Sequence, residues 1–384
     1  MAGLYIHIPF CRQACHYCDF HFSTTLKEKG RMVNAILNEL ELRKDYTGNE
    51  IIETIYFGGG TPSLLESNQL KSILEKINKL FKISQDAEIT LEANPDDLVN
   101  EKIRNLNETG INRLSIGIQS FFDDDLKYFN RVHTAKEGVN AIKMAQDAGF
   151  ENITIDLIYG TPGLTIDKWL KNLEAGIELN IPHISCYCLT VEKGTALDHF
   201  IKIKKSPPLD EDLANKHFEI LMDYMYRNNY EQYEISNFCE DGRYSKHNTS
   251  YWKGETYLGI GPSAHSYNKK SRQWNVSNNF KYMQQIEAGQ IPCEIEENTV
   301  STSYNDYILT SLRTKWGCDL NYISKNFGRF FVEHFLFAIE KAIENLYVKK
   351  NKNIFTLTNK GKYFADRIAS DLFILKGEMN ESND

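Results

Sequence analysis

The stretch Leu4-Tyr-Ile-His-Ile-Pro-Phe-Cys-Arg-Gln-Ala-Cys-His-Tyr-Cys18 decides the fold of this chain. An alternating apolar run over Leu4–Ile8 predicts a β-strand, and three closely spaced cysteines, Cys11, Cys15 and Cys18, follow it at once. Thiolates are soft ligands that suit an iron–sulfur cluster or zinc. A four-iron cluster normally takes four cysteines, so three of them would leave one iron open to a cofactor or substrate.

A structural zinc site is the alternative interpretation of the cysteine loop, with His16 or His21 as the fourth ligand. Paired Cys-x2-Cys spacings are more usual for zinc than the Cys-x3-Cys-x2-Cys spacing found here. A disulfide framework is disfavoured, because disulfides are rare in cytosolic chains of this length. The other five cysteines show no ligand spacing and are interpreted as buried thiols: Cys186, Cys188, Cys239, Cys293 and Cys318.

Outward from the cysteines, the first half of the chain repeats a short β-rich run followed by a helical pattern. The predicted strands are Leu4–Ile8, Ile51–Phe57, Glu88–Ala93, Arg113–Gly117, Asn152–Ile158 and His183–Leu189. The predicted helices are Arg31–Tyr46, Gln69–Phe81, Glu101–Thr109, Lys136–Ala148, Asp167–Leu179 and Asp212–Asn228. This alternation predicts an α/β fold of parallel units. Six units are too few for a closed eight-stranded barrel, so a partial (β/α)6 TIM-like barrel is expected.

The chain divides into three parts by composition. Residues 1–205 form the expected partial barrel, and a polar, Pro-containing segment, Lys202–Leu209, is interpreted as a linker. Residues 206–297 hold a connecting helix and a region rich in loops and short strands. Residues 298–384 predict helices followed by a hairpin at Tyr347–Leu357, a pattern typical of a smaller C-terminal winged-helix-like α+β domain.

Polar residues recur where the predicted strands end, and barrels of this kind gather their chemistry at that edge. Each such residue has a simpler interpretation as a tight turn or a structural ion pair, but their common position favours a binding site. The strand-end residues are Gly59, Gly60, Thr61, Glu92, Gln119 and Asp156. Arg131 could pair with a carboxylate or lie at the surface. Tyr5, from its pattern alone, is a core aromatic.

Charge and hydropathy exclude several classes of protein. The chain of 384 residues has a formal net charge of −8, which disfavours generic nucleic-acid binding. We find no apolar run long enough to span a membrane, and the start of the chain lacks a signal-peptide pattern. We therefore expect a cytoplasmic protein that touches membranes only through its partners.

The cysteine spacing is similar to the signature of the radical S-adenosylmethionine superfamily. Further motifs narrow the resemblance to the branch that holds the oxygen-independent coproporphyrinogen III oxidases and the HemW-type haem chaperones. These motifs are Tyr5-Ile-His-Ile-Pro-Phe-Cys11, Tyr17-Cys-Asp19, Gly58-Gly-Gly-Thr-Pro62 and Asp156-Leu-Ile-Tyr-Gly160. In that superfamily the open iron binds the amino and carboxylate groups of S-adenosylmethionine, and one electron cleaves this cofactor to a deoxyadenosyl radical.

The resemblance implies roles residue by residue. Cys11, Cys15 and Cys18 would bind a 4Fe-4S cluster. The residues that would line S-adenosylmethionine sites are Tyr5, Gly59, Gly60, Thr61, Glu92, Gln119, Arg131 and Asp156. One or two cofactor molecules are both compatible with these residues.

Three differences between the two families favour the chaperone. The oxidases have a further cysteine where this chain has Phe20, and an N-terminal extension before the first strand that is lacking here. The chaperones carry a His-Asn-x-x-Tyr-Trp motif, which is His247-Asn-Thr-Ser-Tyr-Trp252 in this chain. His247 could offer imidazole nitrogen to haem iron. The segment alone favours a histidine that caps a loop beside two core aromatics, whereas the resemblance favours haem contact.

The resemblance thus implies a radical S-adenosylmethionine haem chaperone. It would bind haem as cargo, pass it to acceptor haemoproteins of the respiratory chain, some of them membrane enzymes, and take electrons from a donor such as flavodoxin or ferredoxin. The alternative is an oxygen-independent coproporphyrinogen III oxidase, which converts propionate side chains to vinyl groups. Whether the protein is an enzyme stays open at this point. No nucleic-acid partner is expected.

Overall fold

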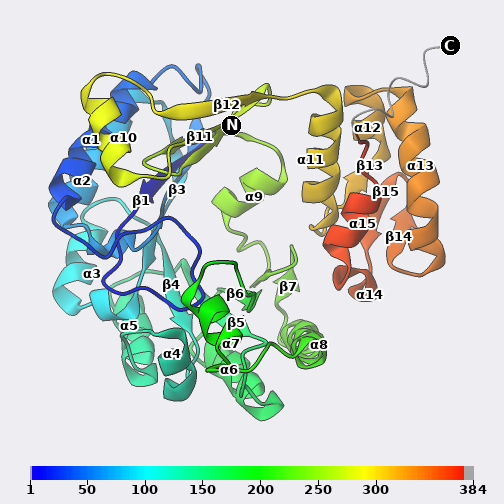
Figure 1. The fold of residues 1–384 in the computed structure, drawn as a ribbon, viewed down its shortest axis with the longest axis horizontal. Helices are drawn as coiled ribbons and strands as arrows, with labels where there is room; N and C mark the ends of the chain where they lie inside the picture. Colours follow the sequence, from blue (N-terminus) through cyan, green and yellow to red (C-terminus); the bar gives the residue numbers. More distant parts are fainter. Residues whose placement is uncertain (1, 376–384) are drawn as a thin grey trace.

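A curved sheet of parallel strands forms the centre of the molecule (Figure 1). The computed structural model describes residues 2–375. Six neighbouring strands run parallel in chain order: β1 Ala2–Ile8, β2 Ile52–Gly59, β3 Ile83–Ala93, β4 Arg113–Gln119, β5 Ile153–Tyr159 and β6 His183–Cys188. Each expected strand is present, which confirms the partial (β/α)6 barrel.

Helices between successive strands cover the outer face of the sheet. They are α1 Lys29–Leu42, α2 Ser67–Leu80, α3 Asn100–Asn107, α5 Ala135–Asp147, α6 Ile166–Glu178 and α8 Glu211–Arg227. Each is amphipathic, as α2 illustrates by burying Leu70, Ile73, Leu74 and Ile77 at helical spacing. Shorter helices lie in the connections: η1 Pro62–Leu64, η2 Pro95–Asp97, α4 Asp123–Phe129 and α7 Ala196–Lys202. Within residues 2–375, no helix has the length and apolar character needed to cross a bilayer.

Segments later in the chain extend the same sheet at both edges. On one side β9, Thr256–Ile260, pairs in parallel with β1. Antiparallel strands follow it, namely β10 His265–Tyr267, β11 Ser271–Asn275 and β12 Cys293–Glu297, and α10 Asn279–Glu287 packs on α1. On the other side β8 Asn237–Cys239 pairs with β6 and with β7 Glu231–Gln232. Short strands were expected in this region, but their attachment to the barrel edges was not.

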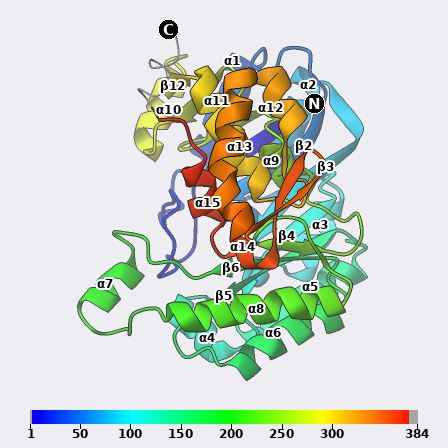
Figure 2. The same ribbon diagram turned by 90° about the vertical axis from the view of Figure 1, so that its right-hand side faces the viewer.

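The C-terminal part has a separate core and a three-stranded antiparallel sheet of order β13-β15-β14. Its elements are α11 Val300–Leu312, β13 Cys318–Asp319, α12 Leu320–Asn326, α13 Arg329–Glu344, β14 Val348–Asn351, β15 Ile354–Leu357, α14 Asn359–Lys362 and α15 Ala365–Asp371. This order of helices and hairpin confirms the winged-helix-like module. Figure 2 shows it from the side, with α13 toward the viewer.

A polar network lies inside the barrel, away from the edge at which the parallel strands end. The Arg113 guanidinium is 2 % exposed and lies 3.8 Å from the Glu88 carboxylate, which is also buried. Arg113 also donates to Thr154, whose hydroxyl is 3.1 Å from His183 Nδ1. Buried charges are tolerated only when they are paired and hydrogen-bonded, so this network must stay intact.

We expect Arg113→Met to lower the free energy of unfolding by about 3 to 5 kcal/mol, because Glu88 is then buried without a counter-ion. Urea unfolding measures the loss. The double variant Glu88→Gln/Arg113→Met should recover much of it, and Arg104→Met on the exposed face of α3 should change stability little. A double variant less stable than the single one would contradict this account.

Candidate functional site

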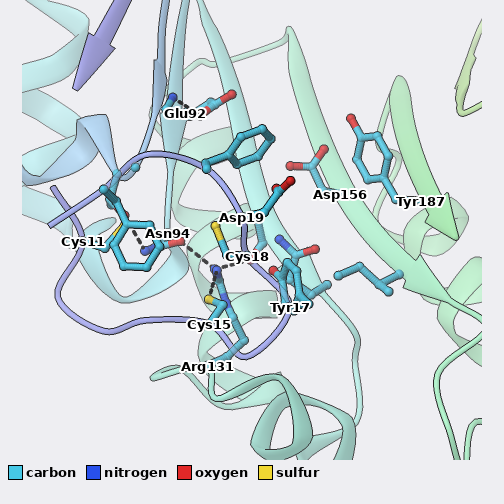
Figure 3. A pocket seen from close by; sticks show the side chains of 18 of the residues that line it. Cys11, Cys15, Tyr17, Cys18, Asp19, Glu92, Asn94, Arg131, Asp156 and Tyr187 are labelled. Carbon is cyan, nitrogen blue, oxygen red and sulfur yellow. Dashed lines mark hydrogen bonds between the residues drawn. The ribbon is translucent and has the colours of Figure 1, made fainter. Parts of the chain in front are cut away.

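A cavity of about 450 Å³ opens at the C-terminal ends of the parallel strands (Figure 3). Cys11, Cys15 and Cys18 all line it. So do seven of the strand-end and loop residues that the sequence predicted: Gly59, Gly60, Thr61, Glu92, Gln119, Arg131 and Asp156. The parallel sheet brings them together, because strands of one direction end at one edge.

The cysteine loop is held by contacts that involve no metal. Its beginning is anchored where the Cys11 N–H donates to the Ser23 carbonyl at 3.0 Å. Its far part is anchored where the Asn130 amide donates to the Ala14 carbonyl at 2.7 Å and the His16 N–H donates to Phe129 at 3.1 Å. The loop is thus positioned by the barrel itself.

Two glycines allow the end of β2 to approach this loop closely. Gly59 has a φ of +107°, and a Cβ there would lie 2.6 Å from the His7 ring. A Cβ on Gly60 would lie 2.7 Å from the Phe10 carbonyl oxygen, just before Cys11. Only glycine fits at these contacts. The glycine motif therefore sets the distance between the β2 end and the cysteine loop.

Arg131 ties the loop to two strands, as the dashed lines in Figure 3 show. Its guanidinium donates to the Asn94 amide oxygen at 2.6 Å and to the Gly117 carbonyl at 2.7 Å. It also lies 3.6 Å from Cys15 Sγ. The cation faces a thiol that would be anionic as a metal ligand. This placement replaces the alternative of a solvated surface arginine.

Two carboxyl groups lie deeper in the cavity and are both perturbed. Burial, partly offset by a 2.8 Å hydrogen bond from the Tyr56 hydroxyl, raises the pKa of Glu92 to about 7. The Glu92 carboxylate also accepts the Gly59 N–H at 3.1 Å. Burial raises the pKa of Asp156 to about 6. Such groups are typical of binding sites, since a cationic ligand would restore their charged form.

Gln119 has a left-handed backbone at the end of β4. Its φ is 67°, and the pairing of β4 with β5 is irregular between Ile116 and this residue. Left-handed conformations are uncommon for residues other than glycine and concentrate at functional sites. This left-handed conformation changes the direction of the chain at the cavity wall, where the Gln119 residue is only 8 % exposed.

The cavity includes residues that sequence reasoning did not select. Tyr187 and Cys188 lie at the end of β6, and Asp19 and Phe22 belong to the cysteine loop region. The interpretation of Cys188 as a buried thiol is wrong, since it is exposed. Its position at the last residue of a strand was the signal that could have found it. Phe20, which is 68 % exposed, also lines the cavity.

Tyr5 and His247 do not line this cavity. The Tyr5 ring stacks near the Tyr56 ring, with centroids 6.1 Å apart, and its hydroxyl lies 3.3 Å from His7 Nδ1. His247, in α9 Lys246–Trp252, is 1 % exposed.

Both imidazole nitrogens of His247 are engaged. Nδ1 lies 2.8 Å from the Thr54 hydroxyl, and Nε2 lies 2.7 Å from the Tyr251 hydroxyl. The N–H of His247 also donates to the Glu88 carboxylate at 3.1 Å, so α9 is seated on β2 and β3. Burial lowers the pKa of His247 to about 3. In this conformation the ring is neutral and has no free nitrogen for a haem iron, so the assignment of His247 to haem stays a prediction.

The histidines of the zinc alternative point elsewhere. The His16 ring lies 2.8 Å from the Tyr128 carbonyl, and the His21 ring lies 2.7 Å from the Asn279 amide oxygen. Among residues 2–375, no three His, Cys, Asp or Glu side chains gather in a way that would hold a single metal ion.

Comparisons with known proteins agree with the geometry. The model of the "Radical SAM superfamily" matches residues 5–176. The chain is 34 % identical to "Heme chaperone HemW" of Bacillus subtilis, over 96 % of this chain and 98 % of that one. It is 37 % identical to "Heme chaperone HemW" of Escherichia coli, over 68 % and 69 %. The coproporphyrinogen III oxidase (HemN) of Escherichia coli, a solved structure, shares the fold with a TM-score of 0.85 and 21 % identity, over 97 % of this chain and 90 % of that one.

The chain belongs to the HemW family of the radical S-adenosylmethionine superfamily. S-adenosylmethionine and a 4Fe-4S cluster are the cofactors of this superfamily. The donor set fits them: three thiols face one cavity, with an arginine beside Cys15 and two carboxyl groups further in. Burial raises the pKa of Cys18 to about 12, so a thiolate there needs the compensation that a bound metal supplies.

The raised pKa of Glu92 predicts a pH dependence of the protein without cofactors. The folded protein keeps the Glu92 proton up to about pH 7, whereas the unfolded chain loses it near 4.5. Stability from this proton is therefore present below about pH 4.5 and is lost as the pH rises through about 7. We expect Glu92→Gln to gain about 1 to 3 kcal/mol over wild type between about pH 5 and about pH 8.

Urea unfolding at a series of pH values checks this expectation. A hydrogen bond lost by the amide shifts the whole curve but leaves its slope unchanged. Glu192→Gln is the matched control, since Glu192 lines the same cavity but is exposed. Parallel curves for wild type and Glu92→Gln would refute the raised pKa.

Proposed function

We propose that this protein is a haem chaperone that binds haem and delivers it to acceptor haemoproteins of the respiratory chain, with membrane enzymes among them. It would act in the cytoplasm and reach the membrane only through these partners. A flavodoxin or ferredoxin would supply electrons to the cluster. The likeness to proteins named heme chaperone HemW over nearly the whole chain supports this proposal.

The observation that carries the proposal is Phe20 at the cavity wall. In the oxidases a further cysteine stands two residues after the triplet, and here that position is an exposed phenyl ring beside the cluster loop. An aromatic ring cannot donate a hydrogen atom or a proton as a thiol can, but it offers a flat apolar surface. The oxidase fold is shared, but this chain has no cysteine at that position.

The residues of the cavity would divide the binding of cofactors among themselves. Cys11, Cys15 and Cys18 would hold the cluster, which supplies the electron for reductive chemistry when bound. Glu92 would accept the amino group of S-adenosylmethionine beside the N–H of Gly59. Arg131 would hold the Cys15 loop against β4 and β3 and keep its charge next to the thiolate.

Haem contact at α9 would require this short helix to break its contacts with β2 and β3. The His247 ring would have to exchange its bonds to Thr54 and Tyr251 for the haem iron. The contacts come from β2 and β3, which also carry Gly59 and Glu92 to the cavity. The same two strands, β2 and β3, would then support both the cofactor site and the helix that contacts haem.

We expect Cys15→Ala to lose the brown absorbance of the cluster while its circular dichroism stays that of the wild type. Cys188→Ala is the matched control, because Cys188 lines the same cavity but lies outside the loop. It should keep the cluster in full. Iron and sulfide content after anaerobic reconstitution decide the matter. Full occupancy in Cys15→Ala, or equal loss in both variants, would overturn the ligand assignment.

One anaerobic experiment separates the chaperone from the oxidase. Reduced, reconstituted protein is incubated with S-adenosylmethionine and coproporphyrinogen, and a second sample is loaded with haem and mixed with an apo-haemoprotein. We expect haem transfer in the second sample and no vinyl-bearing porphyrin in the first. Catalytic formation of the vinyl product would make the protein the oxidase and would refute the proposal.

A further inference from the structure

A second cavity lies at the junction between the barrel edge and the C-terminal module. Its volume is about 160 Å³, several times the roughly 30 Å³ that one water molecule occupies in the liquid. Three segments meet there, namely the β7–β8 turn, the chain after α11, and the β14–β15 hairpin with α14. We call it the junction cavity; its lining includes Gln232, Glu234, Arg313, Lys315, Lys349 and Lys362.

The cations of the junction cavity outnumber the anions. Four basic side chains line it, and Glu234 is the one carboxylate among the lining residues. The Glu234 carboxylate is 3 % exposed and accepts hydrogen bonds from the Ser236 N–H and the Asn237 amide. This carboxylate therefore accepts hydrogen bonds from the turn to which it belongs. Burial also raises the pKa of Glu234, which weakens its negative charge further.

Two of the four cations have ion partners outside the lining. Lys315 pairs with Glu231 at 2.7 Å, and Arg313 pairs with Asp366. The Nε–H of Arg313 is nevertheless buried without a hydrogen-bond acceptor. An orphaned buried donor of a charged group is costly, and an anion in the cavity is the partner that such a group lacks.

The other two cations have no carboxylate partner within residues 2–375. Lys362 donates to the amide oxygens of Gln232 at 2.7 Å and of Asn359 at 3.1 Å, which are neutral. Burial, followed by repulsion from Lys349, lowers the pKa of Lys362 to about 8. Two ammonium groups that repel each other in a partly buried cavity resemble an anion site before its ligand binds.

We propose that the junction cavity binds an oxyanion, a carboxylate or phosphate group, through Lys349, Lys362 and the Arg313 Nε–H. Three threonines line the cavity, but the hydroxyls of Thr314 and Thr358 already donate to the Ser311 and Leu346 carbonyls, so among the lining threonines Thr356 supplies the hydroxyl group for the anion. Because the lining comes from both parts of the chain, the bound anion holds the barrel edge against the C-terminal module.

The oxyanion could come from either of two ligands, and the first of these, haem, rests on the proposed function. The Arg313 guanidinium also lies over the Trp252 ring, 5.7 Å from its centroid, and Trp252 ends the helix that carries His247. A propionate of haem held at α9 could therefore reach the junction cavity. The other source is free phosphate, which needs no haem.

The test uses the whole 384-residue chain with its cluster reconstituted. Inorganic phosphate is titrated by calorimetry and by the rise in melting temperature, and haem and its dimethyl ester are titrated by absorbance. Lys349→Met/Lys362→Met removes the two unpaired cations. Lys352→Met serves as the matched control. Lys352 lies in the turn between β14 and β15, is exposed and does not line the cavity.

We expect the double variant to weaken phosphate binding by about tenfold or more, and the control to bind as wild type does. Without anion the double variant should melt no lower than wild type, since a repulsive pair has been removed. Loss of affinity for haem but not for its ester, in the same variant, identifies propionate as the source. Unchanged haem affinity with lost phosphate binding identifies the free anion.

The proposal fails if wild type and double variant bind phosphate alike and also bind haem alike. It fails as well if Lys352→Met weakens phosphate binding as much as the double variant does, because the effect then does not come from the cavity. Neither failure touches the chaperone function, which the haem-transfer experiment tests with the unaltered protein.

Discussion

The close approach of the β2 end to the cysteine loop is the contact on which the site depends. The Gly60 N–H donates to the Ile8 carbonyl at 2.9 Å, and no side chain fits between Gly60 and Phe10. The parallel pairing of β1 with β2 places Ile8 opposite Gly59, so the sheet register sets where the loop begins. A side chain at Gly60 would displace the backbone just before Cys11, and the cavity would change with it.

Inside the barrel, polar contacts run from the cavity to the opposite end of the barrel. Tyr56 donates to Glu92 at the cavity, and its ring stacks on His247 with centroids 4.9 Å apart. Glu88, on the same strand as Glu92, receives the N-terminal N–H groups of α9 and faces Arg113. The barrel is therefore not filled by apolar layers alone. Hydrogen bonds, a stacked ring pair and an ion pair connect polar groups along its interior, and α9 takes part in these contacts.

Spacing and strand ends were enough to predict the barrel, the cysteine loop and most of the cavity wall, because these follow from local pattern. Parallel strands end at one edge, so Glu92 and Asp156 had to meet. Long-range pairing was not predictable: nothing in Thr256–Ile260 indicates that it joins β1. Nor could pattern show that both nitrogens of His247 are satisfied. Cys186 and Cys188 share one face of β6 by the two-residue period, yet Cys186 is buried and Cys188, the last residue of the strand, is exposed.

The anchoring of the cysteine loop bears on damage and repair. Iron–sulfur clusters are destroyed by oxygen, and many small metal sites unfold when their metal leaves. Here the bonds from Cys11 to Ser23, from Asn130 to Ala14 and from Arg131 to Gly117 all connect protein to protein. Under the proposed function, a molecule that loses its cluster would therefore keep the shape of the cysteine loop. Such a molecule would accept a new cluster without having to refold the loop.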